Sequence, residues 1–412
     1  MILTCAEFVG RCDCGQVHEL DTKYVVVDHG CLKNFEMYMQ LSGLSGRRTI
    51  IYDTNTYNIP GLVHVDADKE IVLEAEGLHA EKEKIESILP QMEDPDVIIA
   101  VGSGTIMDFA RYNAFKLGIP FVAIPTLASA DGYTANICSI IVDGHKRSIA
   151  MQAPVLVVAD LDVISQAPRR MLLSGLADML SKYVSLADWY IANAVADEYY
   201  CGNIASIQYR ALQMASRAAM DIKNGAEPDY GEITMALMIS GIAMQMMGNS
   251  RPASGAEHLI AHLVEMKPPR FENAAGLHGE CVGVGTILCA EAYHEIAEKK
   301  PTAKEFQPLD KAWVEEKFGP LAESVLKENE DDVLKGFHPK AIEYMWGEVQ
   351  EAVNTIPRAE TLRQVFKALG MKTELSEIGI DESLKPEILD ISAAVRNRLT
   401  LARLRRMMEL ND

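Results

Sequence analysis

The first part of the chain, up to residue 160, alternates short apolar runs with longer segments of mixed polarity. Runs that are apolar at nearly every position, and that end in polar or turn residues, predict strands buried on both faces. Helix-length segments between such strands are typical of a parallel sheet that helices cover on both sides. The predicted strands are 24–28, 48–53, 62–65, 96–101, 121–124 and 155–160, and the predicted helices include 31–43 and 81–89.

A hairpin is predicted before the last of these strands, where residues 137–142 and 146–151 flank Asp143-Gly144. From about residue 167 onward, helical periodicity dominates to the end of the chain. The Leu-, Met- and Ala-rich stretches are 170–223, 232–248, 254–265, 279–297, 339–353 and 386–409. We therefore predict an α/β fold with a parallel-sheet domain over residues 1–167, followed by an all-helical domain over residues 168–412.

The composition of the chain mainly excludes classes of partner and location. The 412 residues are 48% hydrophobic and 24% charged, as in an ordinary globular protein with two sizeable cores. The net charge of -20 argues against nucleic acid or an anionic membrane surface as a partner. No apolar stretch reaches the length of a membrane span, and the first residues lack the basic start of a signal peptide. Eight scattered cysteines suit a reducing compartment, so we expect a cytoplasmic protein without membrane insertion.

Cys12, Cys14 and His18 offer three soft metal ligands near the start of the chain. Only one residue separates the two cysteines, whereas structural zinc sites usually have two to four residues there. We therefore expect a turn with buried thiols at this place, in preference to a structural metal.

A glycine-rich turn follows the predicted strand 96–101. It consists of Gly102, Ser103, Gly104 and Thr105, and a predicted helix carrying Asp108 opens after it. Glycines let the backbone approach a phosphate closely, and the N-terminus of a helix presents unpaired N–H groups. The turn lacks the full G-x-G-x-x-G spacing, and a tight turn without a ligand has the same composition. Both interpretations stay open on this stretch alone.

Polar residues at the ends of other predicted strands have the same two interpretations. Asp53 is placed to accept hydrogen bonds from an adenosine ribose, although a loop cap is its more ordinary role. After the strand 121–124, Thr126 and Ser129 can donate to phosphate, and Asp131 can accept from a substrate hydroxyl. The alternative for these three residues is ordinary turn chemistry.

Three histidines and an aspartate predict a metal centre. His258 and His262 lie four apart on a predicted helix, hence on one face, and His278 follows after a Pro268-Pro269 break. Asp178 has apolar neighbours, which favours burial over a surface ion pair with Lys182. Two imidazoles and a carboxylate leave coordination positions open, as catalytic metal sites do. Such a metal acts as a Lewis acid on an alcohol or ketone oxygen.

Five segments, taken in order, resemble the motifs of the iron-containing alcohol dehydrogenase, glycerol dehydrogenase and dehydroquinate synthase superfamily. They are Gly102-Ser103-Gly104-Thr105 with Asp108, PTLASAD at 125–131, SGLAD at 174–178, SGAEHLIAH at 254–262 and LHGE at 277–280. Within it, the SGAEH form, Arg251-Pro252 before it and the start Cys12-Asp13-Cys14-Gly15 resemble the sn-glycerol-1-phosphate dehydrogenases, particularly their bacterial branch. The resemblance covers nearly the whole chain.

This resemblance implies a dehydroquinate synthase-like fold, in which a Rossmann-like domain holds NAD(P) and a helical domain holds one divalent metal. Zinc is the expected metal, while nickel and iron suit the same ligands. The metal ligands would be Asp178, His258 and His278, and His262 would assist proton transfer or substrate binding. By the same resemblance, the pyrophosphate would be bound by Gly102, Ser103, Gly104 and Thr105, beside Asp108. Asp53 would bind the ribose, and Thr126 and Ser129 would contact the nicotinamide. Asp131 would contact the substrate.

The implied reaction interconverts dihydroxyacetone phosphate and sn-glycerol 1-phosphate in a homodimer or larger homo-oligomer. We assign the phosphate of this small three-carbon substrate to Arg251 and His262, with a structural ion pair as the equal alternative for Arg251. Competing functions are a glycerol or other polyol dehydrogenase, a sugar-phosphate cyclase of the dehydroquinate synthase type, and a non-catalytic metal- or nucleotide-binding protein. The cyclases carry Glu where Asp178 stands, which disfavours the second.

Overall fold

The structure is a computed structural model that describes residues 1–142 and 145–411. The turn predicted at Asp143-Gly144 lies outside the described residues. The strands on either side of it form the predicted hairpin, since β9 (Ile137–Val142) pairs antiparallel with β10 (His145–Ala150).

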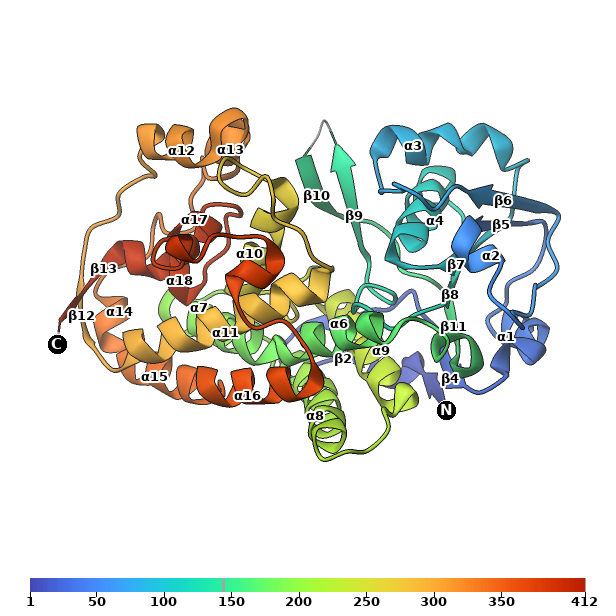
Figure 1. The fold of residues 1–412 in the computed structure, drawn as a ribbon, viewed down its shortest axis with the longest axis horizontal. Helices are drawn as coiled ribbons and strands as arrows, with labels where there is room; N and C mark the ends of the chain where they lie inside the picture. The colour runs from blue at the N-terminus through green and yellow to red at the C-terminus, as the bar shows by residue number, and fades with distance from the viewer. Residues whose placement is uncertain (143–144, 412) are drawn as a thin grey trace. The chain divides into compact units, whose positions relative to one another are not determined.

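A seven-stranded sheet forms the core of the first part of the chain, with the order β1-β4-β11-β8-β7-β5-β6 (Figure 1). Its six neighbouring strands from β4 to β6 are parallel, and β1 joins β4 antiparallel at one edge. The predicted parallel sheet is therefore confirmed. The strands are β1 (Ile2–Thr4), β4 (Tyr24–Asp28), β5 (Arg48–Asp53), β6 (Lys69–Leu73), β7 (Val97–Gly102), β8 (Phe121–Pro125) and β11 (Leu156–Asp160).

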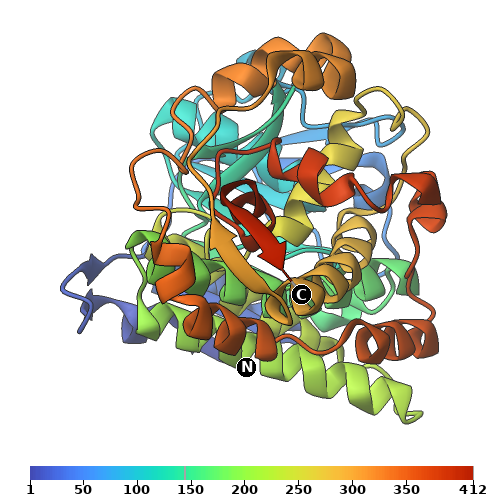
Figure 2. The same cartoon turned by 90° about the vertical axis from the view of Figure 1, so that its left-hand side faces the viewer.

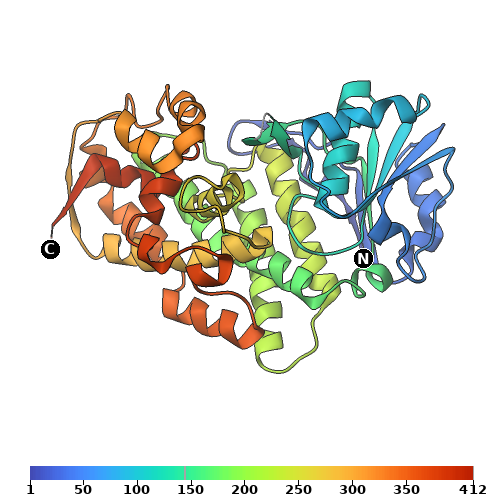
Figure 3. The same cartoon turned by 45° about the horizontal axis from the view of Figure 1, so that its top comes forward.

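Helices lie on both sides of this sheet (Figure 3). On one face, η2 (Cys31–Asn34) and α1 (Phe35–Leu41) pack on alternate strand residues such as Val26, Ile99 and Val158. The helix α4 (Gly104–Leu117) packs against β7, β8 and β5. All six residues of β7 are buried, which explains why its sequence is apolar throughout.

The prediction of a strand at 62–65 is wrong. Leu62 and Val65 belong to the same buried core cluster as residues of α1, but they lie in irregular structure. The edge of the sheet is formed by β6, whose buried residue is Ile71 and whose other positions are polar or partly exposed. An edge strand contacts the core on one face only, so its sequence carries a weaker apolar pattern than that of a central strand.

Helices dominate the rest of the chain, as predicted. They are α6 (Arg169–Leu180), α7 (Lys182–Ala196), α8 (Gly202–Lys223), α9 (Tyr230–Met247), α10 (Ala256–Met266), α11 (His278–Ala297), α12 (Lys311–Phe318), α13 (Ala322–Glu328), α14 (Ala341–Tyr344), α15 (Trp346–Asn354), α16 (Ala359–Leu369), α17 (Ile388–Ala393) and α18 (Leu401–Leu404). The stretch 386–409, predicted to be helical, contains the short helices α17 and α18, and its end belongs to a strand. That strand, β13 (Met408–Asn411), pairs with β12 (Lys300–Ala303) beside the C-terminus (Figure 2).

The chain forms two compact units. The first contains residues 1–179, 206–221 and 226–250, and the second contains residues 180–205, 222–225 and 251–412. The division into domains at residues 167 and 168 stays a prediction. Within the described residues, none of the helices combines the length and apolar character needed to cross a membrane.

Candidate metal centre

Two of the predicted metal ligands lie side by side in the second unit. His258 is in the first turn of α10, and His278 is the first residue of α11. The chain leaves α10 through Lys267 in the left-handed conformation and then Pro268-Pro269, which cannot continue a helix. The two imidazole rings have centroids 5.3 Å apart, and their ligand nitrogens lie within 4.8 Å. The structure therefore brings the two predicted imidazoles together.

A glycine makes this approach of the two helices feasible. A Cβ atom at Gly285 of α11 would lie 2.6 Å from the carbonyl oxygen of Glu257 on α10. That distance is too short for a side chain, so Gly285 allows α11 to pack closely against the turn that carries His258.

Each of the two histidines is held by a glutamate that the sequence did not single out. The Nδ1 of His258 donates to Glu257 Oε1 at 2.7 Å, and the Nδ1 of His278 donates to Glu265 Oε1 at 3.2 Å. A carboxylate that accepts from Nδ1 fixes the tautomer, so that Nε2 carries the lone pair for a metal. Glu257 is fully buried and also accepts from the N–H of Gly255 at 2.8 Å. This arrangement of donors fits a bound divalent metal.

His262 lies one turn after His258 on α10. Its Nδ1 is buried and has no hydrogen-bond partner. Burial lowers the pKa of His262 well below its ordinary value, and the field of Glu265 opposes this only in part. Burial therefore favours the neutral form of the His262 imidazole.

The third predicted ligand, Asp178, lies in the last turn of α6 in the first unit. Its Oδ2 accepts the backbone N–H of Asp131 at 3.1 Å, and Asp131 in turn accepts from the Ser240 hydroxyl at 2.7 Å. Asp178 and Lys182 are both fully buried, so the surface ion pair considered for them is wrong. Gly175 lets α6 lie against the carbonyl of Ala128, which places Asp178 beside the 126–131 loop.

The carboxyl ends of β7 and β8 present a second group of predicted residues. Gly102 and Pro125 are paired in the sheet, and the N–H of Thr126 donates to the Gly102 carbonyl at 3.2 Å. The Thr126 hydroxyl is buried without a hydrogen-bond partner. Ser103 precedes the first turn of α4, and its side chain does not cap the helix. A buried hydroxyl and uncapped helix N–H groups at adjacent strand ends fit the phosphates of a dinucleotide.

Three other predicted residues have structural partners within the first unit. Asp53 caps the short helix α2 (Thr54–Tyr57) by accepting the N–H of Thr56 at 2.8 Å. Asp108 pairs with the buried Arg111 at 2.7 Å. The Ser129 hydroxyl lies 3.4 Å from that of Tyr133. The contacts that these residues are predicted to make with a cofactor stay predictions.

Arg251 holds three segments of the second unit together. Its Nε donates to Glu198 at 2.7 Å, and its Nη2 donates to the carbonyls of Leu399 at 2.7 Å and Asp188 at 3.0 Å. The structural ion pair is therefore present, and phosphate binding by Arg251 stays a prediction. Sequence reasoning missed Arg398, which donates to the Ser254 carbonyl at 2.5 Å. Burial, together with the charge of Arg251, lowers the pKa of Arg398 to about 10.

Comparisons with known proteins cover nearly the whole chain. The family model of iron-containing alcohol dehydrogenases matches residues 26–168. A glycerol-1-phosphate dehydrogenase [NAD(P)+] of Halalkalibacterium halodurans is 31% identical over 403 residues, which cover 95% of this chain and 94% of the relative. The corresponding enzyme of Thermococcus kodakarensis is 38% identical over 254 residues, 60% of this chain and 71% of the relative.

Solved structures agree on the fold. An iron-containing alcohol dehydrogenase from Corynebacterium glutamicum has a TM-score of 0.62 at 17% identity, covering 94% of both chains. A glycerol dehydrogenase from Schizosaccharomyces pombe has a TM-score of 0.54 at 18% identity, covering 85% of this chain and 93% of that one. With a relative above 30% identity over nearly its full length, the chain belongs to the family of glycerol-1-phosphate dehydrogenases, within the iron-containing alcohol dehydrogenases.

Proposed function

We propose that this protein is an NAD(P)- and metal-dependent oxidoreductase that interconverts dihydroxyacetone phosphate and sn-glycerol 1-phosphate. The observation that carries the proposal is the pair of adjacent imidazoles, each held through Nδ1 by a glutamate. This pair lies in a chain whose relatives are named glycerol-1-phosphate dehydrogenases.

The proposed metal ligands are His258, His278 and Asp178. The fit is supported by the two carboxylate-held imidazoles and by the fully buried carboxyl group of Asp178. A divalent metal bound there would polarise the C2 oxygen of the substrate. Imidazole and carboxylate ligands suit zinc, which we expect, and also nickel and iron. His262, a neutral imidazole one turn away, is the proposed proton donor and acceptor for the C2 oxygen.

The proposed cofactor site uses the turn after β7. Gly102, Ser103, Gly104 and Thr105 would hold the pyrophosphate at the N-terminus of α4, with Asp108 nearby, and Asp53 would meet the adenosine ribose. Thr126 and Ser129 would line the nicotinamide side, and Asp131 would contact the substrate. The buried, unpartnered hydroxyl of Thr126 supports this assignment. Bound NAD(P)H would supply the hydride that reduces the C2 carbonyl.

Arg251 and His262 are the proposed phosphate-binding residues. Arg251 also stabilises the second unit through its hydrogen bonds to Glu198 and Leu399. A loss of activity on its replacement would therefore not by itself identify a phosphate contact. We further propose a cytoplasmic homodimer or larger homo-oligomer. The cytoplasm is supported by the eight cysteines, all of which are described and none of which forms a disulfide.

The testing experiment measures NADH oxidation with dihydroxyacetone phosphate before chelation, after chelation and after metal is added back, and determines the stereochemistry of the product. We expect stoichiometric NADH oxidation that follows the metal, with sn-glycerol 1-phosphate as the product. Equal activity on dihydroxyacetone would indicate a polyol dehydrogenase. Turnover of a sugar phosphate without net NADH oxidation would indicate a cyclase. A metal-loaded protein that converts none of these substrates would indicate a non-catalytic metal- or nucleotide-binding protein.

A further inference from the structure

A second group of metal-ligating side chains lies far along the sequence from the histidines of α10 and α11. It belongs to a small hairpin in which β2 (Gly10–Arg11) pairs with β3 (Val17–His18). The N–H of Cys12 donates to the carbonyl of Gln16 at 2.9 Å, and that of Gly15 donates to the carbonyl of Cys12 at 2.9 Å. Gly15 has a φ of 86°, which a glycine adopts without strain. The predicted turn is thus present, although its thiols are only half-buried.

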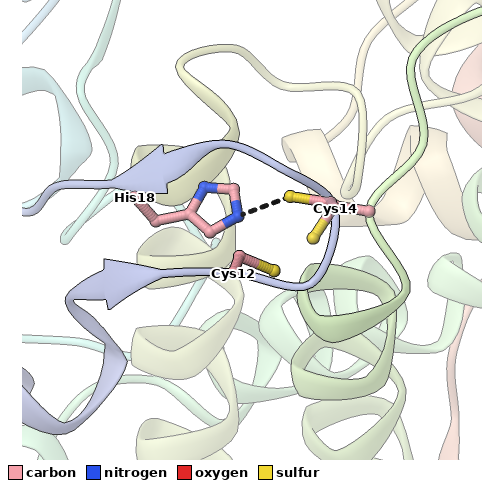
Figure 4. A group of neighbouring side chains, drawn as sticks. Cys12, Cys14 and His18 are labelled. Atoms are coloured by element: carbon pink, nitrogen blue, oxygen red, sulfur yellow. Dashed lines mark hydrogen bonds between the residues drawn. The ribbon is translucent and has the colours of Figure 1, made fainter.

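This turn brings Cys12, Cys14 and His18 together (Figure 4). The two sulfur atoms and a ring nitrogen of His18 lie within 4.8 Å of one another. Cys14 Sγ and His18 Nε2 lie 3.5 Å apart. Sulfur and nitrogen atoms that converge in this way can become ligands of one ion after small side-chain rotations, because bonds to zinc are about 2.0–2.3 Å long.

His18 is oriented as metal-binding histidines usually are. Its Nδ1 donates to the carbonyl of Met246, in α9, at 3.0 Å. This hydrogen bond places the ring proton on Nδ1 and turns the lone pair of Nε2 towards the cysteine sulfur. The side chain is 5% exposed, so its orientation is fixed by its surroundings.

The hairpin has little apolar burial with which to stabilise itself. Of its four strand residues only His18 is buried, and Val17 is 62% exposed. A two-stranded hairpin of this size is marginally stable in water without another source of stability. A metal that binds the folded turn supplies such stability, because its binding free energy adds to that of folding.

We propose that Cys12, Cys14 and His18 bind a zinc ion through two thiolates and one imidazole, as a structural site separate from the catalytic metal. A water molecule or another protein group completes the coordination. Binding releases two protons, one from each thiol, because thiolates are the ligating form. The ion fastens the hairpin to the end of α9 through the hydrogen bond between His18 and Met246. The thiolate ligands favour zinc over the hard cations magnesium and calcium.

Cobalt substitution of the full-length protein tests this proposal. Co²⁺ bound by thiolates gives an intense sulfur-to-metal charge-transfer band in the near ultraviolet. The proposed catalytic ligands Asp178, His258 and His278 contain no sulfur, so they do not produce this band. We expect the band in the wild-type protein, its loss when zinc is added, and its absence in the Cys12→Ser/Cys14→Ser variant. The matched control is Asp13→Asn, which changes the exposed residue between the two cysteines and should keep the band.

The wild-type measurement decides the matter even if the double variant fails to fold. No charge-transfer band in fully reduced wild-type protein would overturn the proposal, as would an unchanged band in a folded double variant. The same spectra separate this proposal from the proposed function. Wild-type protein that reduces dihydroxyacetone phosphate but shows no band would refute the thiolate site alone, whereas wild-type protein that shows the band but is inactive would refute the proposed function alone.

Discussion

The carboxylate behind His258 offers the sharpest test of how the metal centre is built. Glu257→Gln keeps the size of the side chain and an oxygen that can still accept from His258 and from Gly255. The other carboxylate oxygen is buried without a hydrogen-bond partner, so the amide group of glutamine would be placed there without an acceptor. The substitution therefore removes the negative charge that makes the imidazole a stronger ligand, while the unpaired buried amide lowers stability without touching the metal ligands.

The structure also ranks this effect against that of the second glutamate. Loss of such a supporting carboxylate weakens metal binding by about 10- to 100-fold, which corresponds to about 1.4–2.8 kcal/mol. The Glu257 bond is 2.7 Å long and its carboxylate is fully buried, whereas the Glu265 bond is 3.2 Å long and its side chain is 21% exposed. We therefore expect Glu257→Gln to fall at the upper end of this range, and Glu265→Gln at about tenfold or less.

The assay is competition for the metal with a chromophoric chelator, on protein whose Cys12 and Cys14 are replaced so that one site is titrated. Glu272→Gln changes an exposed glutamate of the same unit and should keep wild-type affinity. Unchanged metal affinity in Glu257→Gln, or a greater loss in Glu265→Gln than in Glu257→Gln, would refute the reasoning.

The remaining predictions concern packing, substrate and pH. Gly285→Ala should lower the free energy of unfolding by about 1–3 kcal/mol, because the added Cβ has no room. Gly347→Ala is the control and should not lower it, because no atom lies within 4 Å of the added Cβ. Chemical denaturation of both variants measures this difference. If Arg251 binds phosphate, Arg251→Lys should raise the KM for dihydroxyacetone phosphate severalfold. Glu198→Gln breaks the same ion pair and should leave this KM unchanged. An equal rise in KM in both variants would show that Arg251 has a structural role only. Burial, followed by the charge of Glu257, raises the pKa of Asp188 to about 7, so the folded state binds more protons than the unfolded state between about pH 4 and 7. The stability contributed by Asp188 therefore falls as pH rises through this window, and Asp188→Asn should show a smaller loss in Tm between pH 5 and pH 8 than wild type.

The sequence predicted those parts of the molecule in which burial and periodicity coincide. The central strands β7 and β8 are buried at every position, so their apolar runs marked them clearly. His258 and His262 fall on one helix because their spacing matches the helical period. The helix α16 was missed although Leu362, Val365, Phe366 and Leu369 are spaced for one buried helical face. The helical spacing of these apolar residues was sufficient to predict α16 from the sequence.

Other features depend on contacts that no local pattern encodes. The stretch 386–409 has helical periodicity, yet the helical structure is interrupted between α17 and α18. There the N–H of Leu401 donates to Asp188, a residue far away in the sequence. Likewise, nothing near Glu265 indicates that its carboxylate meets His278 after a proline break. Leu62 and Val65 are buried as their sequence suggests, but burial alone does not make a strand.

The most direct test of the central claim is the metal content of single variants, made in a background that lacks Cys12 and Cys14. Asp178→Ala, His258→Ala and His278→Ala should each purify without the metal while remaining folded. His262→Ala, together with His29→Ala at an exposed histidine, should retain about one metal ion per chain. A folded His278→Ala or Asp178→Ala protein that keeps a full complement of metal would contradict the account.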